Sequence, residues 1–213
     1  MINIRTFTFN MFQVNSFVIN DETNECVIID PGCYITAETS KLKNYIEKSG
    51  FKPVLLINTH CHIDHILGNK FVFEEYGLKP LLHNEELVVL TSANEFSKML
   101  NLPDPESPLA DTFLQDNQVI KFGNSELEVI FTPGHTPGHI SLYSEENKFI
   151  ICGDVLFDGS IGRTDLPGGD YLTLIRSIKT RILPLGDDIT VYSGHGDTTT
   201  TGKERNSNPF LLF

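Results

Sequence analysis

The chain has 213 residues, of which 40% are hydrophobic and 21% are charged, and its formal net charge at pH 7 is −12. This length is enough to bury a core without cross-links, and the composition is ordinary for a globular protein. The acidic balance argues against a nucleic-acid partner, because binding phosphates requires clustered lysine and arginine. From the length we expect a single domain over residues 1–213. No apolar stretch has the length of a signal peptide or a membrane span, so we expect a cytoplasmic location and no membrane partner.

Hydrophobic periodicity predicts that the first half of the chain consists of strands followed by helical crossovers. Strands are predicted near 2–9, 16–20, 25–29, 54–57 and 80–83, and helices near 37–49, from 64 or 65 to about 76, and near 85–98. Asp64 is well placed to cap the second of these helices.

The second half repeats this arrangement after a proline-rich connection at 101–109. Strands are predicted near 116–121, 126–131, 140–144 and 148–152, followed by a helix at about 169–181 and a last strand before His195. Two sheets covered by outer helices, a four-layer αββα sandwich of the α/β class, fit this order of elements.

Four cysteines lie far apart in the chain, and no two of them form a C-x-x-C pair. A disulfide framework or a thiolate zinc site is therefore not expected. We interpret Cys26 and Cys152 as small buried apolar residues and Cys61 as a spacer between two possible metal ligands; the fourth is Cys33.

The run from His60 to His65 holds four side chains that can bind a metal, directly after an apolar strand. Alternate residues of an extended loop point the same way, so His60 and His62 can share one ion, while Asp64 and His65 face a neighbouring position. Histidine and aspartate suit zinc, iron or manganese. The competing explanation is a chance cluster of polar loop residues, and the rest of the chain weakens it.

Three more segments repeat the pattern of an apolar run, a glycine and a possible ligand. They end in Gly134-His135, Gly153-Asp154 and Gly194-His195. Side chains just beyond the carboxyl ends of strands meet along one edge of such sheets, and a glycine allows the backbone to turn sharply there. Each segment alone is weak evidence, but together with the first cluster they predict a two-metal centre.

At these positions the sequence resembles the metallo-β-lactamase superfamily, and specifically its glyoxalase II-like (hydroxyacylglutathione hydrolase-like) members. Residues 59–65 match T-H-x-H-x-D-H, residues 132–138 match T-P-G-H-T-x-G, and the likeness covers nearly the whole chain. The resemblance implies the αββα fold and two groups of metal ligands. By the resemblance, one ion is held by His60, His62 and His135, the other by Asp64, His65 and His195, and Asp154 bridges them.

The resemblance implies a metal-dependent hydrolase with two divalent ions, for which zinc is the first choice and iron or a zinc/iron mixture is an alternative. A water shared by two ions has a pKa near roughly 7, which provides a hydroxide nucleophile at neutral pH. Asp154 and Asp64 are the predicted catalytic residues: Asp154 bridges the ions and Asp64 orients or deprotonates the water. The implied substrate is a small-molecule thioester of the S-lactoylglutathione type. The acyl group, the thiol carrier and the oligomeric state stay open.

Several residues near these motifs have two interpretations. Asp30, Thr59 or Thr132 could accept a hydrogen bond from a ligating histidine, although Asp30 fits an Asp-Pro-Gly turn equally well. His83 and His139 are interpreted as structural histidines. Arg163, in a loop similar to the family's G-x-G-R-T-D, either binds a substrate carboxylate or pairs with Asp165. The apolar end 208–213 is expected to close over the protein's own core, with a dimer contact as the alternative.

Other functions in the same superfamily compete with thioester hydrolysis. Persulfide dioxygenases share much of the motif set but use one iron, and this is the main alternative. Flavodiiron proteins carry an appended flavin domain, many β-lactamases have cysteine in place of Asp154, and nucleases need basic patches that a net charge of −12 disfavours. Long glyoxalase II enzymes add a helical carboxyl-terminal region with glutathione contacts; we expect this chain to be of the short kind.

Overall fold

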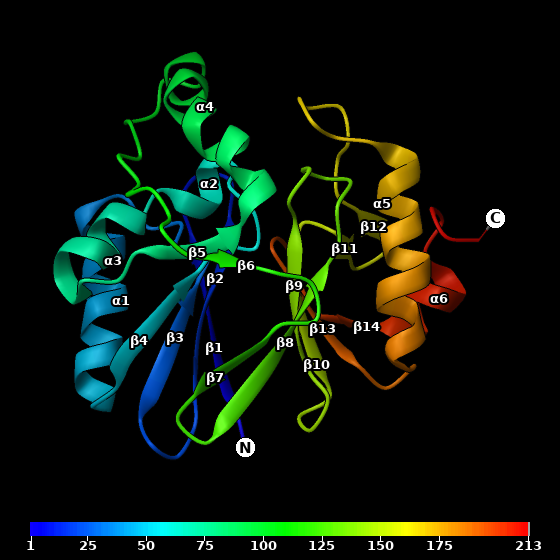
Figure 1. Ribbon diagram of the computed structural model, residues 1–213, viewed down its shortest axis with the longest axis horizontal. Coiled ribbons are helices and arrows are strands. Elements are labelled where there is room, and N and C mark those ends of the chain that lie inside the picture. Colours follow the sequence, from blue (N-terminus) through cyan, green and yellow to red (C-terminus); the bar gives the residue numbers. More distant parts are fainter. Residues whose placement is uncertain (213) are drawn as a thin grey trace. The chain divides into compact units, whose positions relative to one another are not determined.

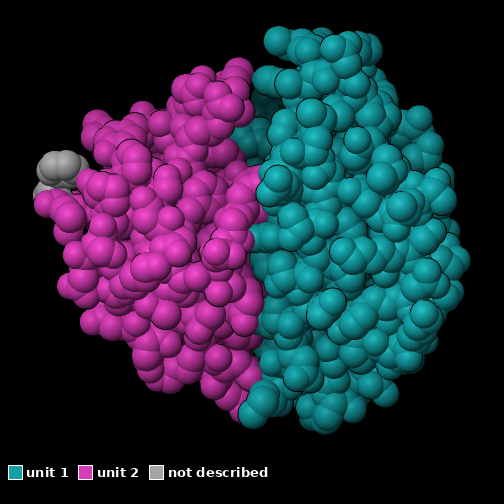
Figure 2. All heavy atoms as spheres, turned by 180° about the vertical axis from the view of Figure 1, so that it is seen from behind, with its two compact units in different colours: residues 1–113, 121–126 teal, residues 114–120, 127–213 magenta. Residues whose placement is uncertain are grey.

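The computed structural model describes residues 1–212, and these form two compact units (Figure 2). Of the described residues, unit 1 comprises 1–113 and 121–126, and unit 2 comprises 114–120 and 127–212. Within residues 1–212, no helix has both the length and the apolar character that crossing a membrane requires.

The first sheet has six strands in the order β1-β2-β3-β4-β5-β6 (Figure 1). Their bounds are β1 Asn3–Phe9, β2 Val14–Asn20, β3 Glu25–Ile29, β4 Lys52–Ile57, β5 Pro80–His83 and β6 Phe113–Leu114. The strands β1, β2 and β3 pair antiparallel, whereas β3, β4 and β5 are parallel. Because parallel strands end at the same edge, the residues after β3, β4 and β5 come together there.

The helices of unit 1 pack their apolar side chains onto this sheet. They are α1 Thr36–Ser49, α2 Ile63–Ile66, α3 Asn69–Tyr76, the 3₁₀ turn η1 Asn84–Glu86 and α4 Leu87–Met99. Leu42 and Ile46 of α1 share a buried cluster with Leu56 of β4 and Val72 of α3. Helix α1 ends where Gly50 adopts a left-handed conformation, φ 68°, which glycine adopts without strain.

The single helix predicted from residue 64 or 65 to about 76 is in fact two helices, α2 and α3. The chain breaks at Gly68, whose N–H donates to the Pro31 carbonyl at 2.7 Å. A Cβ there would lie 2.8 Å from the Cys33 sulfur, so only glycine fits this close approach. The N-cap of α2 is His62, and Asp64 lies in its first turn instead of at the predicted cap.

The second sheet has the order β14-β13-β10-β9-β8-β7, and a two-stranded ribbon pairs β11 with β12 (Figure 1). The bounds are β7 Val119–Phe122, β8 Ser125–Phe131, β9 Ile140–Ser144, β10 Phe149–Gly153, β11 Leu156–Phe157, β12 Ser160–Ile161, β13 Thr190–Ser193 and β14 Thr199–Thr200. The strand predicted at 116–121 starts only at Val119, because Asn117 has φ 60° and the chain turns there. Strands β10 and β13 are parallel, so the residues after them lie side by side.

Unit 2 contains α5 Tyr171–Ser177, which continues as a π-helical turn η2 Ile178–Ile182 and a 3₁₀ turn η3 Leu183–Leu185, and α6 Thr201–Ser207. Asp170 caps α5 by accepting from the Thr173 N–H at 2.7 Å. The sequence did not predict the β11–β12 ribbon or α6, because each is too short to show a hydrophobic period.

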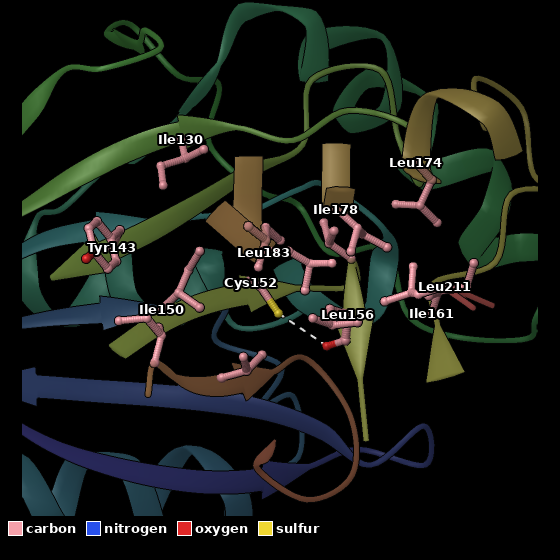
Figure 3. Close-up of a cluster of buried hydrophobic side chains, with 14 residues drawn as sticks. Ile130, Tyr143, Ile150, Cys152, Leu156, Ile161, Leu174, Ile178, Leu183 and Leu211 are labelled. Atoms are coloured by element: carbon pink, nitrogen blue, oxygen red, sulfur yellow. Dashed lines mark hydrogen bonds between the residues drawn. The ribbon is translucent and has the colours of Figure 1, made fainter. Parts of the chain in front are cut away.

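Figure 3 shows the buried cluster that joins α5 and η2 to the second sheet. Cys152 of β10 lies within it and donates from its sulfur to the Leu156 carbonyl at 3.3 Å. Burial raises the pKa of this thiol to about 12, in agreement with its predicted role as a small apolar residue. Leu211 also belongs to the cluster, so the carboxyl-terminal segment closes over the core as expected; Phe213 lies outside the described residues.

Leu211→Ala should lower the free energy of unfolding by about 2 kcal/mol, because it removes a buried side chain and leaves a cavity. Leu212, which is 59% exposed against 7% for Leu211, provides the matched control, and Leu212→Ala should change stability by less than about 0.5 kcal/mol. Urea unfolding of the two variants measures both values. Equal effects would show that the terminal segment does not pack in solution as described.

Candidate metal centre

The histidine cluster of unit 1 begins in the loop after β4, which carries His60 and His62, and continues into α2, which carries Asp64 and His65. The rings of His60 and His62 have centroids 4.9 Å apart, and those of His60 and His65 lie 4.1 Å apart. His60 and His65 are buried, whereas His62 and Asp64 are partly accessible. The predicted alternation is present, because the Cys61 side chain instead enters an apolar cluster on α2, β5 and α4. Burial and nearby carboxylates raise the pKa of this thiol well above its usual value.

Asp30 follows β3 and supports this loop with both carboxylate oxygens. Its Oδ1 accepts from the Thr59 N–H at 2.7 Å, and its Oδ2 accepts from the Thr59 hydroxyl at 2.6 Å and from His65 Nδ1 at 3.0 Å. In a neutral His65 ring the lone pair is then on Nε2, the atom that can bind a metal. Asp30 is fully buried and also turns the chain, with φ 48°. Asp30 thus both accepts the expected hydrogen bond from a histidine and forms the expected turn.

Thr59 connects Asp30 to a second histidine, His60, and fixes the tautomer of that ring as well. Its hydroxyl gives its hydrogen to Asp30, so the contact of 3.1 Å with His60 Nδ1 must be donated by the ring. The Nε2 atoms of His60 and His65 are therefore both set up as acceptors by one carboxylate. Asp30 already accepts three hydrogen bonds from Thr59 and His65, an arrangement typical of a carboxylate that supports ligating histidines.

Glu86, in η1, is a buried acidic residue that sequence reasoning missed. Its Oε2 accepts from the Cys61 N–H at 2.8 Å, in the middle of the histidine cluster. The side chain is fully buried, and this bond fixes the backbone between His60 and His62. Glu86 had no signal in the sequence, because an acidic residue at the start of a helix is commonplace.

In unit 2, His135 follows β8 in a tight turn. Gly134 has φ 129°, and a Cβ there would lie 2.2 Å from the Leu174 backbone nitrogen, so glycine is required. His135 Nδ1 donates to the Arg163 carbonyl at 2.7 Å. This again places the lone pair of a neutral ring on Nε2. The acceptor is a backbone carbonyl, which no residue type could have revealed.

Asp154 lies between two histidines of unit 2. Its Oδ2 is 3.6 Å from His135 Nε2 and 3.5 Å from His195 Nε2. The segments that carry Asp154 and His195 are joined by the Gly194 N–H, which donates to the Gly153 carbonyl at 2.7 Å. Within this unit the structure thus brings together all three predicted ligand residues.

The remaining histidines agree with their structural interpretation. His139 accepts from the Asp154 N–H at Nε2, 3.2 Å, and contacts the Thr132 hydroxyl at Nδ1, 3.1 Å, so both ring nitrogens are engaged within the protein. Thr132 therefore serves His139 and not a ligand histidine. His83 Nδ1 accepts from the Glu85 N–H at 3.4 Å and caps η1.

Arg163 is exposed and makes a two-pronged ion pair with Asp165. Its Nε and one terminal nitrogen each donate to the carboxylate at 2.7 Å, which lowers the pKa of Asp165 to about 2. This ion pair supports the interpretation that Arg163 braces its loop. The backbone carbonyl of Arg163 also accepts the hydrogen bond from His135.

The spacing and chemistry of these donors fit a divalent ion. Two ligand atoms at about 2.1 Å from a tetrahedral zinc lie about 3.4 Å apart. The two contacts of Asp154 in unit 2 have this spacing, and so does the 3.6 Å between His65 Nε2 and Asp64 Oδ2 in unit 1. Imidazole and carboxylate donors suit zinc or iron.

Residues 10–195 match the sequence profile of the metallo-β-lactamase superfamily. The chain belongs to this superfamily. Over 99% of its length it is 40% identical to the hydroxyacylglutathione hydrolase GloC of Haemophilus influenzae, and the match covers 98% of that protein. The superfamily and the histidine and aspartate groups together imply divalent metal ions.

Solved structures of the superfamily show the same fold. The BLEG-1 B3 metallo-β-lactamase superposes with a TM-score of 0.91 and 34% identity, over 99% of this chain and 100% of that one. TTHA1623, solved in a di-iron-bound form, gives a TM-score of 0.88 and 34% identity, over 97% and 100%. The predicted αββα class is confirmed.

Asp30→Asn should weaken zinc binding by about 10–100-fold, because the amide nitrogen would face groups that need an acceptor and the histidine tautomers would no longer be fixed. Competition with a chelating dye measures this affinity. Asp111→Asn, which removes an exposed carboxylate of unit 1 paired with Lys79, should bind zinc like the wild type. Unchanged affinity in Asp30→Asn would refute the supporting role of Asp30.

Proposed function

We propose that the protein is a dinuclear metal-dependent hydrolase that cleaves a thioester of the S-lactoylglutathione type. The observation that carries this proposal is the position of Asp154, whose carboxylate oxygen lies 3.5–3.6 Å from both His135 and His195 and can serve two ions. Its support from relatives is the 40% identity to the Haemophilus influenzae hydroxyacylglutathione hydrolase over almost the full chain.

In this proposal seven residues hold two ions and the two units act as one domain. The ligands are His60, His62 and His135 for one ion, Asp64, His65 and His195 for the other, and Asp154 for both. A single superfamily profile spans residues 10–195 and therefore parts of both units, which supports a single domain over 1–213. A cytoplasmic location and a small-molecule substrate belong to the same proposal.

The ions, when bound, supply a water with a pKa near roughly 7 and polarise the thioester carbonyl. The protein's part is to orient and to accept protons. Asp64 is partly accessible, and its backbone carbonyl accepts from the Asn10 side chain at 3.0 Å, which fixes the start of α2. Its carboxylate is proposed to orient the attacking water or take its proton. Water adds to the carbonyl, the carbon–sulfur bond breaks, and an acid and a thiol are released.

The metals are proposed to be zinc, iron or a mixture. TTHA1623 has been solved with two irons, and BLEG-1 is a B3 metallo-β-lactamase. The similarity to BLEG-1 makes opening of a β-lactam ring the second candidate reaction. A mononuclear iron persulfide dioxygenase is the alternative from outside the hydrolases.

Asp154→Ala should reduce turnover by several orders of magnitude, because it removes the one carboxylate proposed to be common to both ions. The wild type should hold about two metal equivalents per chain, because seven ligand groups are more than one tetrahedral or octahedral ion needs. The variant should hold less metal, because it lacks a ligand proposed for both ions. Elemental analysis and a steady-state assay give both values. Asp188→Asn, an exposed acid paired with Lys148, is the matched control. Near-wild-type hydrolysis by Asp154→Ala would contradict the proposed mechanism.

S-lactoylglutathione should be cleaved in anaerobic buffer with one thiol released per acid formed, because water supplies the entering oxygen. A panel of other thioesters and a β-lactam, tested on the same metal-analysed sample, ranks the substrates. Oxygen consumption with glutathione persulfide, one iron per chain and no anaerobic thioester cleavage would instead establish the dioxygenase. Preferred opening of the β-lactam would establish the second candidate.

Arg163 is proposed to bind a substrate carboxylate in addition to its contact with Asp165. Arg163→Ala should then raise KM about tenfold with little change in kcat, the loss expected for one charge-assisted hydrogen bond. Asp165→Asn leaves the guanidinium in place and should not raise KM. If both variants change the kinetics equally, Arg163 only braces its loop.

A further inference from the structure

We propose that Glu204, on the carboxyl-terminal helix α6, is a positioning residue for the metal ligands of unit 2. Its buried carboxylate connects the β11–β12 ribbon, which follows Asp154, to β14, which follows His195. The inference rests on the proposed ligand role of these residues, but not on the proposed substrate.

Glu204 is fully buried and receives three hydrogen bonds. Its Oε1 accepts from the Thr199 hydroxyl at 2.5 Å, and its Oε2 accepts from the Gly159 N–H at 3.0 Å and from the Asn208 side chain at 2.8 Å. A buried carboxylate is costly unless its oxygens are satisfied, so these donors are held to it firmly. The three donors come from three different segments.

The β11–β12 ribbon that Glu204 holds lies between Asp154 and Arg163, whose carbonyl supports His135. It starts two residues after Asp154 and ends just before Gly162, whose N–H donates to the Val155 carbonyl at 3.3 Å. A Cβ on Gly162 would lie 1.9 Å from the Asp154 carbonyl oxygen and 3.2 Å from His135 Nδ1, so the backbone passes directly against both. The next residue, Arg163, accepts the His135 hydrogen bond.

Two hydrogen bonds hold the tip of the ribbon, one to Glu204 in α6 and one to Asn208, the C-cap residue of α6. Gly159 has φ 70° in the turn and bonds Glu204, and the Ser160 carbonyl accepts from the Asn208 side chain at 2.9 Å. Since Asn208 also donates to Glu204, these groups form one network centred on two buried side chains, Glu204 and Asn208. Movement of the tip would be passed along the ribbon to Asp154 and to the acceptor of His135.

The other end of the network reaches His195. Thr199 pairs with Val191 of β13, and β13 leads directly into Gly194 and His195. The Phe157 ring of the ribbon meets the His195 ring edge to face, with centroids 6.2 Å apart. Through Thr199 and Gly159, Glu204 therefore fixes the two segments whose ligands must stay about 3.5 Å apart.

The test measures zinc release from zinc-loaded protein to the chelating dye 4-(2-pyridylazo)resorcinol, at a temperature at which every variant is folded. Thr199→Val removes one donor to Glu204 with little change in shape, and Thr199→Ser keeps it. We expect Thr199→Val and Glu204→Gln to release zinc about 10–100-fold faster, the effect typical of losing a residue that supports metal ligands, and Thr199→Ser to release it like the wild type. Glu146→Gln, which neutralises an exposed acid of unit 2, is the charge control.

Wild-type release rates in folded Thr199→Val and Glu204→Gln would overturn the proposal. So would equal acceleration in Thr199→Ser or Glu146→Gln, which would indicate general loosening. If Glu204→Gln does not fold, the threonine pair still decides the question. Thioester turnover plays no part in this test: a wild type that holds zinc but cleaves no thioester would contradict the proposed function alone, whereas a wild type that holds no zinc would overturn both.

Discussion

The buried carboxylate of Asp30 is the interaction on which the histidine cluster of unit 1 depends. Through one contact to His65 and one relayed by the Thr59 hydroxyl to His60, it sets the tautomer of two rings. Imidazole can bind a metal only through a nitrogen that lacks hydrogen, so fixing the tautomer comes before any metal chemistry. A buried negative charge is tolerated here because three donors surround it.

In unit 2, the tautomer of His135 is fixed by a backbone carbonyl and not by a carboxylate. His135 donates to the Arg163 carbonyl, and the loop that supplies this carbonyl is held in place by glycine contacts, by the Arg163–Asp165 pair and by the network around Glu204. A neutral acceptor adds no buried charge next to Asp154. Its position depends on the whole loop, however, so the support of His135 is spread over residues far from it in sequence.

This difference explains how much the sequence could predict. The predicted ligand residues and Asp30 stand out in the sequence because they follow apolar runs and have side chains with metal-binding or acceptor chemistry. Glu86 and Glu204 were missed because a buried acid on a short helical element has the same composition as an exposed one. The Arg163 carbonyl has no signature at all. The break at Gly68 was missed because its cause, close contact with Pro31 and Cys33, lies in another part of the chain.

The supporting network also bears on how one fold can serve several reactions. A hydroxyacylglutathione hydrolase and a B3 β-lactamase both resemble this chain at 34–40% identity, so the scaffold alone does not specify the substrate. Asp30 and Glu204 each already accept three hydrogen bonds from the protein itself, so their carboxylates are engaged in support and we do not expect them to select a substrate. We therefore expect substrate selectivity to come from accessible side chains near the proposed metal ligands. Met11 and Phe12, in the turn that Asn10 ties to the Asp64 carbonyl, are 69% and 36% exposed and meet this requirement in unit 1. In unit 2, the Arg163 side chain is exposed and Phe157 is partly accessible, while the backbone of the same loop holds His135, so this loop combines a fixed backbone with accessible side chains.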